Sequence, residues 1–208
     1  MERGQFFQSN RKTRVFLDAV ADLTGTRGLR VLLRLAGLHA WIEELPPYDD
    51  ELGVDFCDVT LVSKMLLFMY GPRGGGGLSM RAGRMMFRAI REQFGDKMLD
   101  EACLGALDIH QRAQAVLQFL VDSWPRHSNG QTSLIYTDNN TFRFKFDPCP
   151  ELWGQHRPEL CYGTLGFLQD ALEWCDLGDI YQVSQLPPTD GEAGHAVCQF
   201  EIHRVIFK

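Results

Sequence analysis

The histidines and cysteines are the side chains of this 208-residue sequence with the widest chemistry, and there are six of each. His110 draws attention because helical spacing, about 100° per residue, places it on the apolar side of an expected helix, Ala102–Trp124. Two interpretations stay open for it. His110 is either a core histidine with a satisfied hydrogen bond, or a polar group that faces an apolar ligand pocket.

Catalytic patterns are missing from the sequence. It contains no Gly-x-Ser-x-Gly elbow and no His-Glu-x-x-His. The glycine-rich stretch 71–77 is followed by Leu78-Ser79-Met80, whereas a phosphate-binding loop needs Gly-Lys-Ser/Thr. We interpret that stretch as a hinge or lid before the next helix. We therefore predict no catalytic residue and no cofactor, and the balance is against an enzyme.

Hydrophobic patterning predicts an α+β fold. Phe142, Phe144 and Phe146 alternate with polar residues, as does the segment Ala196–Ile202. With two further β-rich runs, they predict a four-stranded antiparallel sheet covered on one face by helices. The strands are expected at Ser133–Thr137, Thr141–Asp147, Ile180–Leu186 and Ala196–Ile202. The helices are expected at Arg11–Leu23, Leu29–Ala36, Val59–Tyr70, Ser79–Phe94, Ala102–Trp124 and Leu160–Cys175.

The acidic connector Pro46–Glu51 is the best candidate boundary in the chain. Residues 1–55 are expected to form an N-terminal helical extension, and residues 56–208 a ligand-binding domain. One helix carries a row of arginines, which is either a solvated face or a docking site for an anionic group or a dimer partner. The row consists of Arg81, Arg84, Arg88 and Arg91.

Composition excludes several classes of protein. The net charge of −6 argues against direct nucleic-acid binding, which needs a basic surface. The longest apolar stretch, Met65–Tyr70, is too short to span a bilayer, and the N-terminus lacks the apolar core of a secretory signal. Six scattered cysteines do not make a disulfide scaffold, so a cytoplasmic location is expected.

The segment Leu160–Ile202 resembles the C-terminal half of the 4-vinyl reductase domain family. The matching positions there are Cys161, Gly166, Leu168, Leu172, Trp174, Gly194, Cys198 and Phe200. Upstream, Cys149-Pro150, Trp153-Gly154 and Arg81-Ala82-Gly83-Arg84 also match, so the resemblance covers roughly Phe56–Lys208. The family occurs in phenol-sensing regions of transcription activators and in a protein of bacteriochlorophyll synthesis, and is related to vesicle-tethering subunits.

This resemblance implies an α/β fold around a small-molecule pocket, often in a homodimer. It also supports the ligand-facing interpretation of His110, because phenol-sensing relatives bind the ligand hydroxyl with a helix histidine and a tryptophan. The ligand is expected to be apolar, and aromatic or tetrapyrrole-like. The pocket is expected to be lined by His110, Trp124, Phe142, Phe144, Phe146, Trp153, Cys161, Phe167 and Trp174.

The resemblance also raises the question of a metal site, because phenol-sensing relatives bind structural zinc through cysteines and an acidic residue. Cys161 and Cys198 match two of those positions, but the turn 185–190 between them offers no cysteine and no glutamate. Two thiolates alone do not make a tetrahedral site. Other candidates are available but unforced, namely Cys149, Cys175, Asp190 and His195. We therefore predict no metal.

Together these patterns favour a cytoplasmic small-molecule-binding module, a sensor or carrier, that forms a homodimer and passes any signal to a partner. One alternative is an enzyme or accessory factor in the vinyl reduction of a tetrapyrrole. A second alternative is a structural dimerisation module that resembles the tethering subunits.

Overall fold

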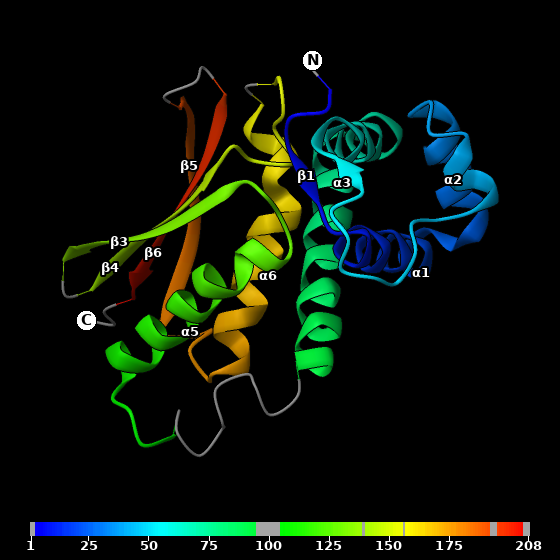
Figure 1. Ribbon diagram of the computed structural model, residues 1–208. Helices are drawn as coiled ribbons and strands as arrows, with labels where there is room; N and C mark the ends of the chain where they lie inside the picture. The colour runs from blue at the N-terminus through cyan, green and yellow to red at the C-terminus, as the bar shows by residue number, and fades with distance from the viewer. Residues whose placement is uncertain (1–2, 95–104, 139, 156, 192–194, 206–208) are drawn as a thin grey trace.

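The chain has an α+β fold, seen in a computed structural model that describes residues 3–94, 105–138, 140–155, 157–191 and 195–205 (Figure 1). Its main sheet has four antiparallel strands in the order β3-β4-β6-β5. The predicted fold class is therefore confirmed. The strands are β3 Gln131–Asp138, β4 Thr141–Asp147, β5 Tyr181–Asp190 and β6 Ala196–Arg204.

One face of this sheet is apolar because alternate residues of its two central strands point to the same side. Phe144 pairs with Phe200 across β4 and β6, and both side chains are fully buried. Helix α5 (Ile109–Ser123) packs on this face, where His110 stacks on Phe142 with ring centres 4.9 Å apart. The predicted inward face of Thr141–Asp147 is thus confirmed.

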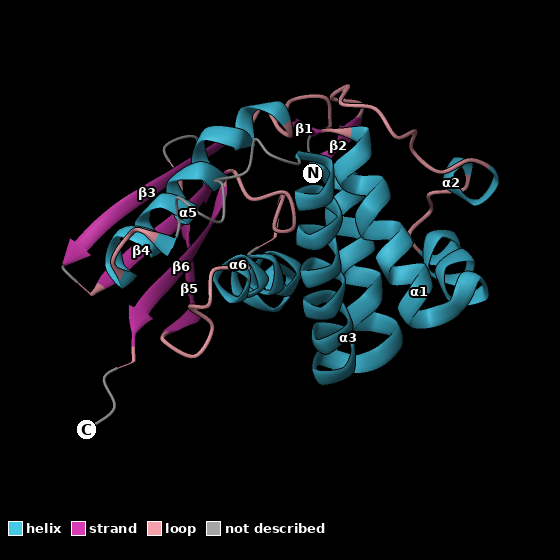
Figure 2. Ribbon diagram, turned by 90° about the horizontal axis from the view of Figure 1, so that it is seen from below, coloured by secondary structure: helices cyan, strands magenta, loops and turns pink. Residues whose placement is uncertain are grey.

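Helix α6 (Tyr162–Trp174) lies between the sheet and helix α3 (Phe56–Phe94) in both views (Figures 1 and 2). Helix α1 (Asn10–Leu35) packs on α3, and the short α2 (Ala40–Glu43) follows it. The helical part of the chain, formed by α1, α2 and α3, is on the side of α6 that faces away from the sheet. A two-residue strand β1 (Phe7–Gln8) pairs with β2 (Val54–Asp55) and ties the start of α1 to the start of α3.

The stretch 71–77 was predicted as a hinge or lid before the next helix. The chain does break there, with a kink at Gly71 (φ of 72°), but it is helical again directly afterwards, so the stretch is no lid. Two of the following glycines, Gly75 and Gly76, serve close packing. A Cβ at Gly75 would collide with the Leu66 carbonyl, and one at Gly76 would collide with the Tyr162 ring. The break expected at Gly25 within α1 is confirmed by its φ of 76°.

Backbone contact between α3 and α6 sets the spacing of the helical part against the sheet. A Cβ at Gly83 would collide with the Gly163 carbonyl, and one at Gly166 with the Met80 carbonyl. Part of the predicted arginine row also faces α6. Arg88 makes a two-pronged ion pair with the buried Asp170, at 2.7 Å for the shortest contact. Arg81, Arg84 and Arg88 are nevertheless exposed, so the row is a solvated face from which Arg88 pairs with Asp170.

Two predicted element boundaries also need correction. Helix α5 begins at Ile109 rather than Ala102, because Asp108 and Gln111 form a capping box there. Residues 102–104 of the predicted helix lie outside the described residues, as do Asn139 of the predicted turn and Gly194 of the family pattern. Strand β5 continues past Leu186 through two prolines, with a register shift before Thr189.

The N-terminal helices share the hydrophobic core with the rest of the chain. Phe16 and Leu17 of α1 belong to the same buried cluster as Phe87 of α3 and Leu168 of α6. The division into residues 1–55 and 56–208 stays a proposal. None of the helices in the described ranges combines the length and apolar character that crossing a membrane requires.

Candidate functional site

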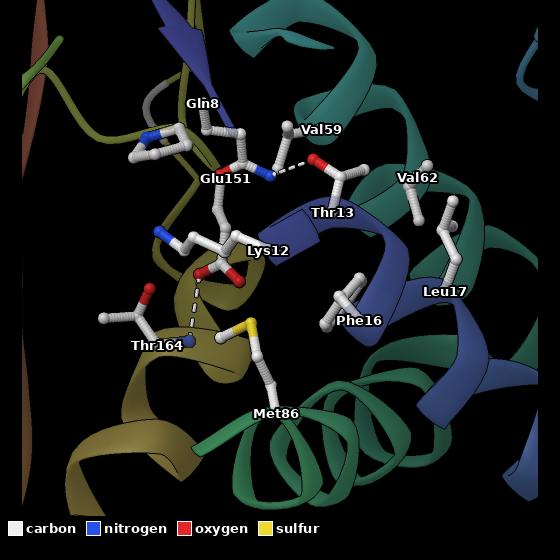
Figure 3. Close-up of a pocket in the computed structure, with 11 residues that line it drawn as sticks. Gln8, Lys12, Thr13, Phe16, Leu17, Val59, Val62, Met86, Glu151 and Thr164 are labelled. Atoms are coloured by element: carbon white, nitrogen blue, oxygen red, sulfur yellow. Dashed lines mark hydrogen bonds between the residues drawn. The ribbon is translucent and has the colours of Figure 1, made fainter. Parts of the chain in front are cut away.

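Two ionisable side chains are buried together where α1, α3 and the segment before α6 meet (Figure 3). Lys12 is 7% exposed and Glu151 is 8% exposed, and both line a cavity of about 30 Å³. Charged groups are almost never this buried unless they are paired or functional. The other lining residues are Gln8, Thr13, Phe16, Leu17, Val59, Val62, Met86, Pro150 and Thr164.

Lys12 reaches the cavity from the first turn of α1, which Ser9 caps by accepting a hydrogen bond from the Lys12 backbone N–H. Its Nζ lies 3.5 Å from the centre of the Trp124 ring. It donates no hydrogen bond to any of the described residues. Burial lowers the pKa of Lys12 to about 7, although the charge of Glu151 acts in the opposite direction.

Glu151 reaches the same cavity from the loop before α6. One carboxylate oxygen accepts a hydrogen bond of 3.2 Å from the Thr164 backbone N–H, in the first turn of α6. Gly163 makes room for this contact, since a Cβ there would collide with the carboxylate. Burial nevertheless raises the pKa of Glu151 to about 7, because desolvation of the carboxylate outweighs the Thr164 hydrogen bond and the Lys12 charge.

A second cavity, of about 20 Å³, also borders Lys12. It is nearly apolar and includes His127, whose pKa is lowered to about 4 by burial and then by the Lys12 charge. Lys12 is therefore the side chain common to the two cavities. The other lining residues are Phe87, Ile90, Phe119, Leu120, Ser123, Trp124 and Phe167.

The chemistry open to this site follows from the two buried groups. An amine and a carboxyl group with similar pKa values exchange a proton at little cost near neutral pH. A neutral Lys12 is a nucleophile and a base, and Glu151 can take up or release the proton.

The structure brings several of the predicted pocket residues together on the sheet. His110 stacks on Phe142, Trp124 meets Phe146 with ring centres 4.7 Å apart, and Phe144 lies beside Phe146. Nδ1 of His110 is buried and has no hydrogen-bond partner among the described residues. This is an aromatic core layer, with Trp124 alone of these five residues lining one of the two small cavities.

The remaining predicted pocket residues lie elsewhere. Trp153 belongs to a separate cluster with Phe6 and Phe56. Phe167 and Trp174, on α6, contact Phe87 of α3, and Phe167 also lines the smaller cavity. The predicted set therefore occupies several places rather than one pocket.

Cys161 lies in a cluster of buried thiols. It forms a disulfide with Cys198, and the sulfur of Cys149 lies 3.6 Å from that of Cys161. The three sulfur atoms lie within 4.8 Å of one another, close enough for one metal ion. The disulfide, however, uses two of them, and burial raises the pKa of the Cys149 thiol strongly, which disfavours a thiolate. Absence of a metal stays a prediction.

Sequence reasoning missed both buried ionisable residues. A signal for Lys12 was present, because it precedes Val15 and Phe16 by three and four positions and so falls on the inward stripe of its helix. Glu151 lies in an irregular loop, where no periodicity reports burial. Its hydrogen bond with the Thr164 backbone N–H cannot be predicted from the sequence, because it depends on how the start of α6 packs against the loop.

Comparison with known proteins gives a fold but no family. No protein-family model matches the chain, and no curated protein matches it. Solved structures of H-NOX proteins do match. A mutant from T. tengcongensis has a TM-score of 0.59 at 11% identity, over 94% of this chain and 98% of that chain. An Fe(II) unliganded mutant from K. algicida has a TM-score of 0.54 at 14% identity, over 95% of this chain and 97% of that chain. An Fe(II) mutant from S. oneidensis has a TM-score of 0.53 at 14% identity, over 96% of this chain and 97% of that chain.

These matches correct the resemblance to the 4-vinyl reductase family, because the matching structures are H-NOX domains. Packing explains the misleading pattern. Gly166 is needed where α6 approaches the backbone of α3, and Leu168 and Phe200 are fully buried core residues. Such positions recur wherever a helix packs between a sheet and another helix. The expectation of a role in tetrapyrrole or bacteriochlorophyll chemistry loses its support with the resemblance.

Proposed function

We propose that this chain is a sensory module that binds a small molecule of a few heavy atoms beside Lys12 and Glu151. The observation that carries the proposal is the burial of both groups at one cavity of about 30 Å³. Unmatched burial of an amine and a carboxyl group costs stability, and such perturbed groups cluster at functional sites. The H-NOX proteins that share the fold are heme-binding sensors of nitric oxide and oxygen, which favours sensing over structural support.

Heme itself does not fit the described residues. Ligand pockets of that class need several hundred Å³, and the cavities beside Lys12 measure about 30 and 20 Å³. A larger hollow of about 320 Å³ among the described residues is an open polar groove, and no histidine or cysteine lines it. His110 stacks on Phe142 and lines none of these three hollows. We therefore assign no heme chemistry to this chain.

The size of the cavity limits the ligand further. About 10–15 Å³ of such space holds one water molecule, and a cavity of about 150 Å³ is known to bind benzene. A space of about 30 Å³ thus suits two or three heavy atoms and excludes a single aromatic ring. The predicted aromatic or tetrapyrrole-like ligand stays a prediction that these cavities do not favour.

The position of the two groups supplies a route for a response. Lys12 belongs to α1, whereas Glu151 is hydrogen-bonded to the first turn of α6. A ligand that changes the charge of either group changes the attraction between these elements.

We propose binding rather than turnover as the role of the site. A homodimer and a cytoplasmic location also stay predictions, the first to be checked by light scattering.

Hydrogen–deuterium exchange tests this proposal with three probes, namely sodium formate, sodium nitrite and carbon dioxide–bicarbonate buffer. At least one probe should change exchange in both the first turn of α1 and the first turn of α6. Val62→Ile adds one methylene at the cavity wall and should abolish the change. Val15→Ile is the matched control, because Val15 is buried in the same core but does not line the cavity. Unchanged exchange with every probe would contradict the proposal.

A further inference from the structure

We infer that the ligand of this pocket is carbon dioxide, which the Lys12 amine captures as a carbamate while Glu151 takes the released proton. The inference rests on the proposed small-molecule site and names its ligand. It is drawn from a lysine side chain and a glutamate side chain that line one cavity of about 30 Å³ (Figure 3).

The first requirement is an amine with a free lone pair. A lysine with the ordinary pKa of about 10.4 is neutral in only about one molecule in a thousand at pH 7.4. Burial places Lys12 in the opposite regime, with a pKa of about 7. Among the described residues its Nζ has the Trp124 ring as a neighbour and no hydrogen-bond acceptor, so no hydrogen bond has to break before it reacts.

The second requirement is space of the right size. Carbon dioxide is linear and has three heavy atoms, which matches a cavity with room for about two water molecules. The wall is mostly apolar, with polar groups from Gln8, Thr13 and Thr164. An uncharged, weakly polar gas enters such a space at a lower desolvation cost than bicarbonate or another anion.

The third requirement is a proton acceptor. The Lys12 lone pair forms a bond to the carbon of carbon dioxide, and one C–O π pair moves onto oxygen. The N–H proton then passes to the Glu151 carboxylate, which leaves an Nζ-carboxylate on Lys12 and a neutral carboxyl group on Glu151. The site carries one negative charge before and after the step, so no net charge is buried.

The product would alter the contacts of both elements. A carbamate would bring a negative charge to the face of the Trp124 ring, which is the negative side of the ring quadrupole, so the contact that Lys12 makes there becomes unfavourable. A protonated Glu151 is also a weaker acceptor for the Thr164 N–H than the carboxylate. Capture of one gas molecule thereby weakens an anchor of α1 and an anchor of α6 together.

Chemical trapping tests the inference directly. Protein in ¹³C-labelled carbon dioxide–bicarbonate buffer at pH 7.4 is alkylated with triethyloxonium, which converts carbamates to stable esters, and is then digested for mass spectrometry. The Lys12 peptide should carry the ¹³C label at least about tenfold more than the Lys145 peptide, since one pKa unit of difference is already worth tenfold in neutral amine. Lys145 is the internal control because it lies in a surface ion pair with Asp147.

Two variants separate capture from folding. Lys12→Arg should lose the label, with circular dichroism checking its fold. Glu151→Gln keeps the amine and the size of the side chain, and should lower the label several-fold because the proton acceptor is gone. An unlabelled Lys12 in the wild-type protein, or equal label on Lys12 and Lys145, would overturn the inference. If Lys12 stays unlabelled while formate or nitrite still changes exchange at α1 and α6, carbon dioxide is wrong and the proposed site stands.

Discussion

The Lys12 amine lies 3.5 Å from the centre of the Trp124 ring, where the first turn of α1 meets the end of α5. A cation over an indole face is favourable, by up to about 2 kcal/mol when both are desolvated. Burial acts against that contact and prevails, because the pKa of Lys12 falls to about 7. The ring therefore positions an amine that is substantially neutral at physiological pH.

Lys12 should make the stability of the protein rise with pH on the alkaline side. Its pKa is about 7 in the folded chain and near 10.5 in the unfolded chain, so between these values the unfolded state binds the extra proton. The free energy of unfolding should gain about 1 kcal/mol per pH unit from this group. Urea titrations from pH 7 to pH 10 measure it as the difference between wild type and Lys12→Met. Lys145→Met should leave the slope unchanged, and a pH-independent difference for Lys12→Met would refute the assignment.

Glu151 should act in the opposite direction on the acid side. Its pKa is raised from 4.5 to about 7 on folding, so its contribution is fully present below pH 4.5 and is lost as pH rises through 7. The contribution should decline by about 1 kcal/mol per pH unit across that window. Glu151→Gln should remove the decline while keeping an acceptor for the Thr164 N–H. The exposed Glu43→Gln serves as the control, and an identical slope in both variants would argue against a buried carboxyl group.

The approach of α3 to α6 predicts unequal effects of two glycine substitutions in one helix. Gly83→Ala would place a methyl group against the Gly163 backbone, whereas a Cβ at Gly77 meets nothing within 4 Å. Gly83→Ala should therefore destabilise the protein by about 1–3 kcal/mol or more. Gly77→Ala should be neutral or stabilise it by up to about 1 kcal/mol through helix propensity. Thermal unfolding of both variants checks this, and equal melting temperatures would contradict the packing described here.

Sequence periodicity predicts which residues of a helix or strand point inward, because a whole face of the element is buried. Phe142, Phe144 and Phe146 were placed correctly because alternation reports the buried side of a strand. Gly75 and Gly76 were misread, because composition cannot distinguish glycine used for flexibility from glycine used for close packing. The Lys12–Glu151 site could not be predicted as a pair, since its members are 139 positions apart and meet only through tertiary packing. His110 shows the same limit. The inward face of its helix was predicted correctly, but the Phe142 ring on which it stacks belongs to another element, strand β4.

The thiol cluster can be tested for its bonding and for metal in one sample. Alkylation of the denatured, unreduced protein should leave Cys161 and Cys198 unmodified and joined, while Cys149 is alkylated. Elemental analysis should find no zinc, and a chelator should leave the melting temperature unchanged. Alkylation of all three cysteines together with about one zinc per chain would show that the sulfur atoms share a metal instead.

Titration of the Lys12 amine itself is the most direct test of the proposed site. Lysine labelled with ¹³C at Cε gives signals for five side chains, and Lys12→Arg identifies the one that belongs to position 12. We expect the Lys12 signal to titrate with a midpoint near pH 7, so that the amine is largely neutral at physiological pH. A midpoint above pH 10, as in a free lysine side chain, would show that Lys12 stays charged and would contradict the proposed site.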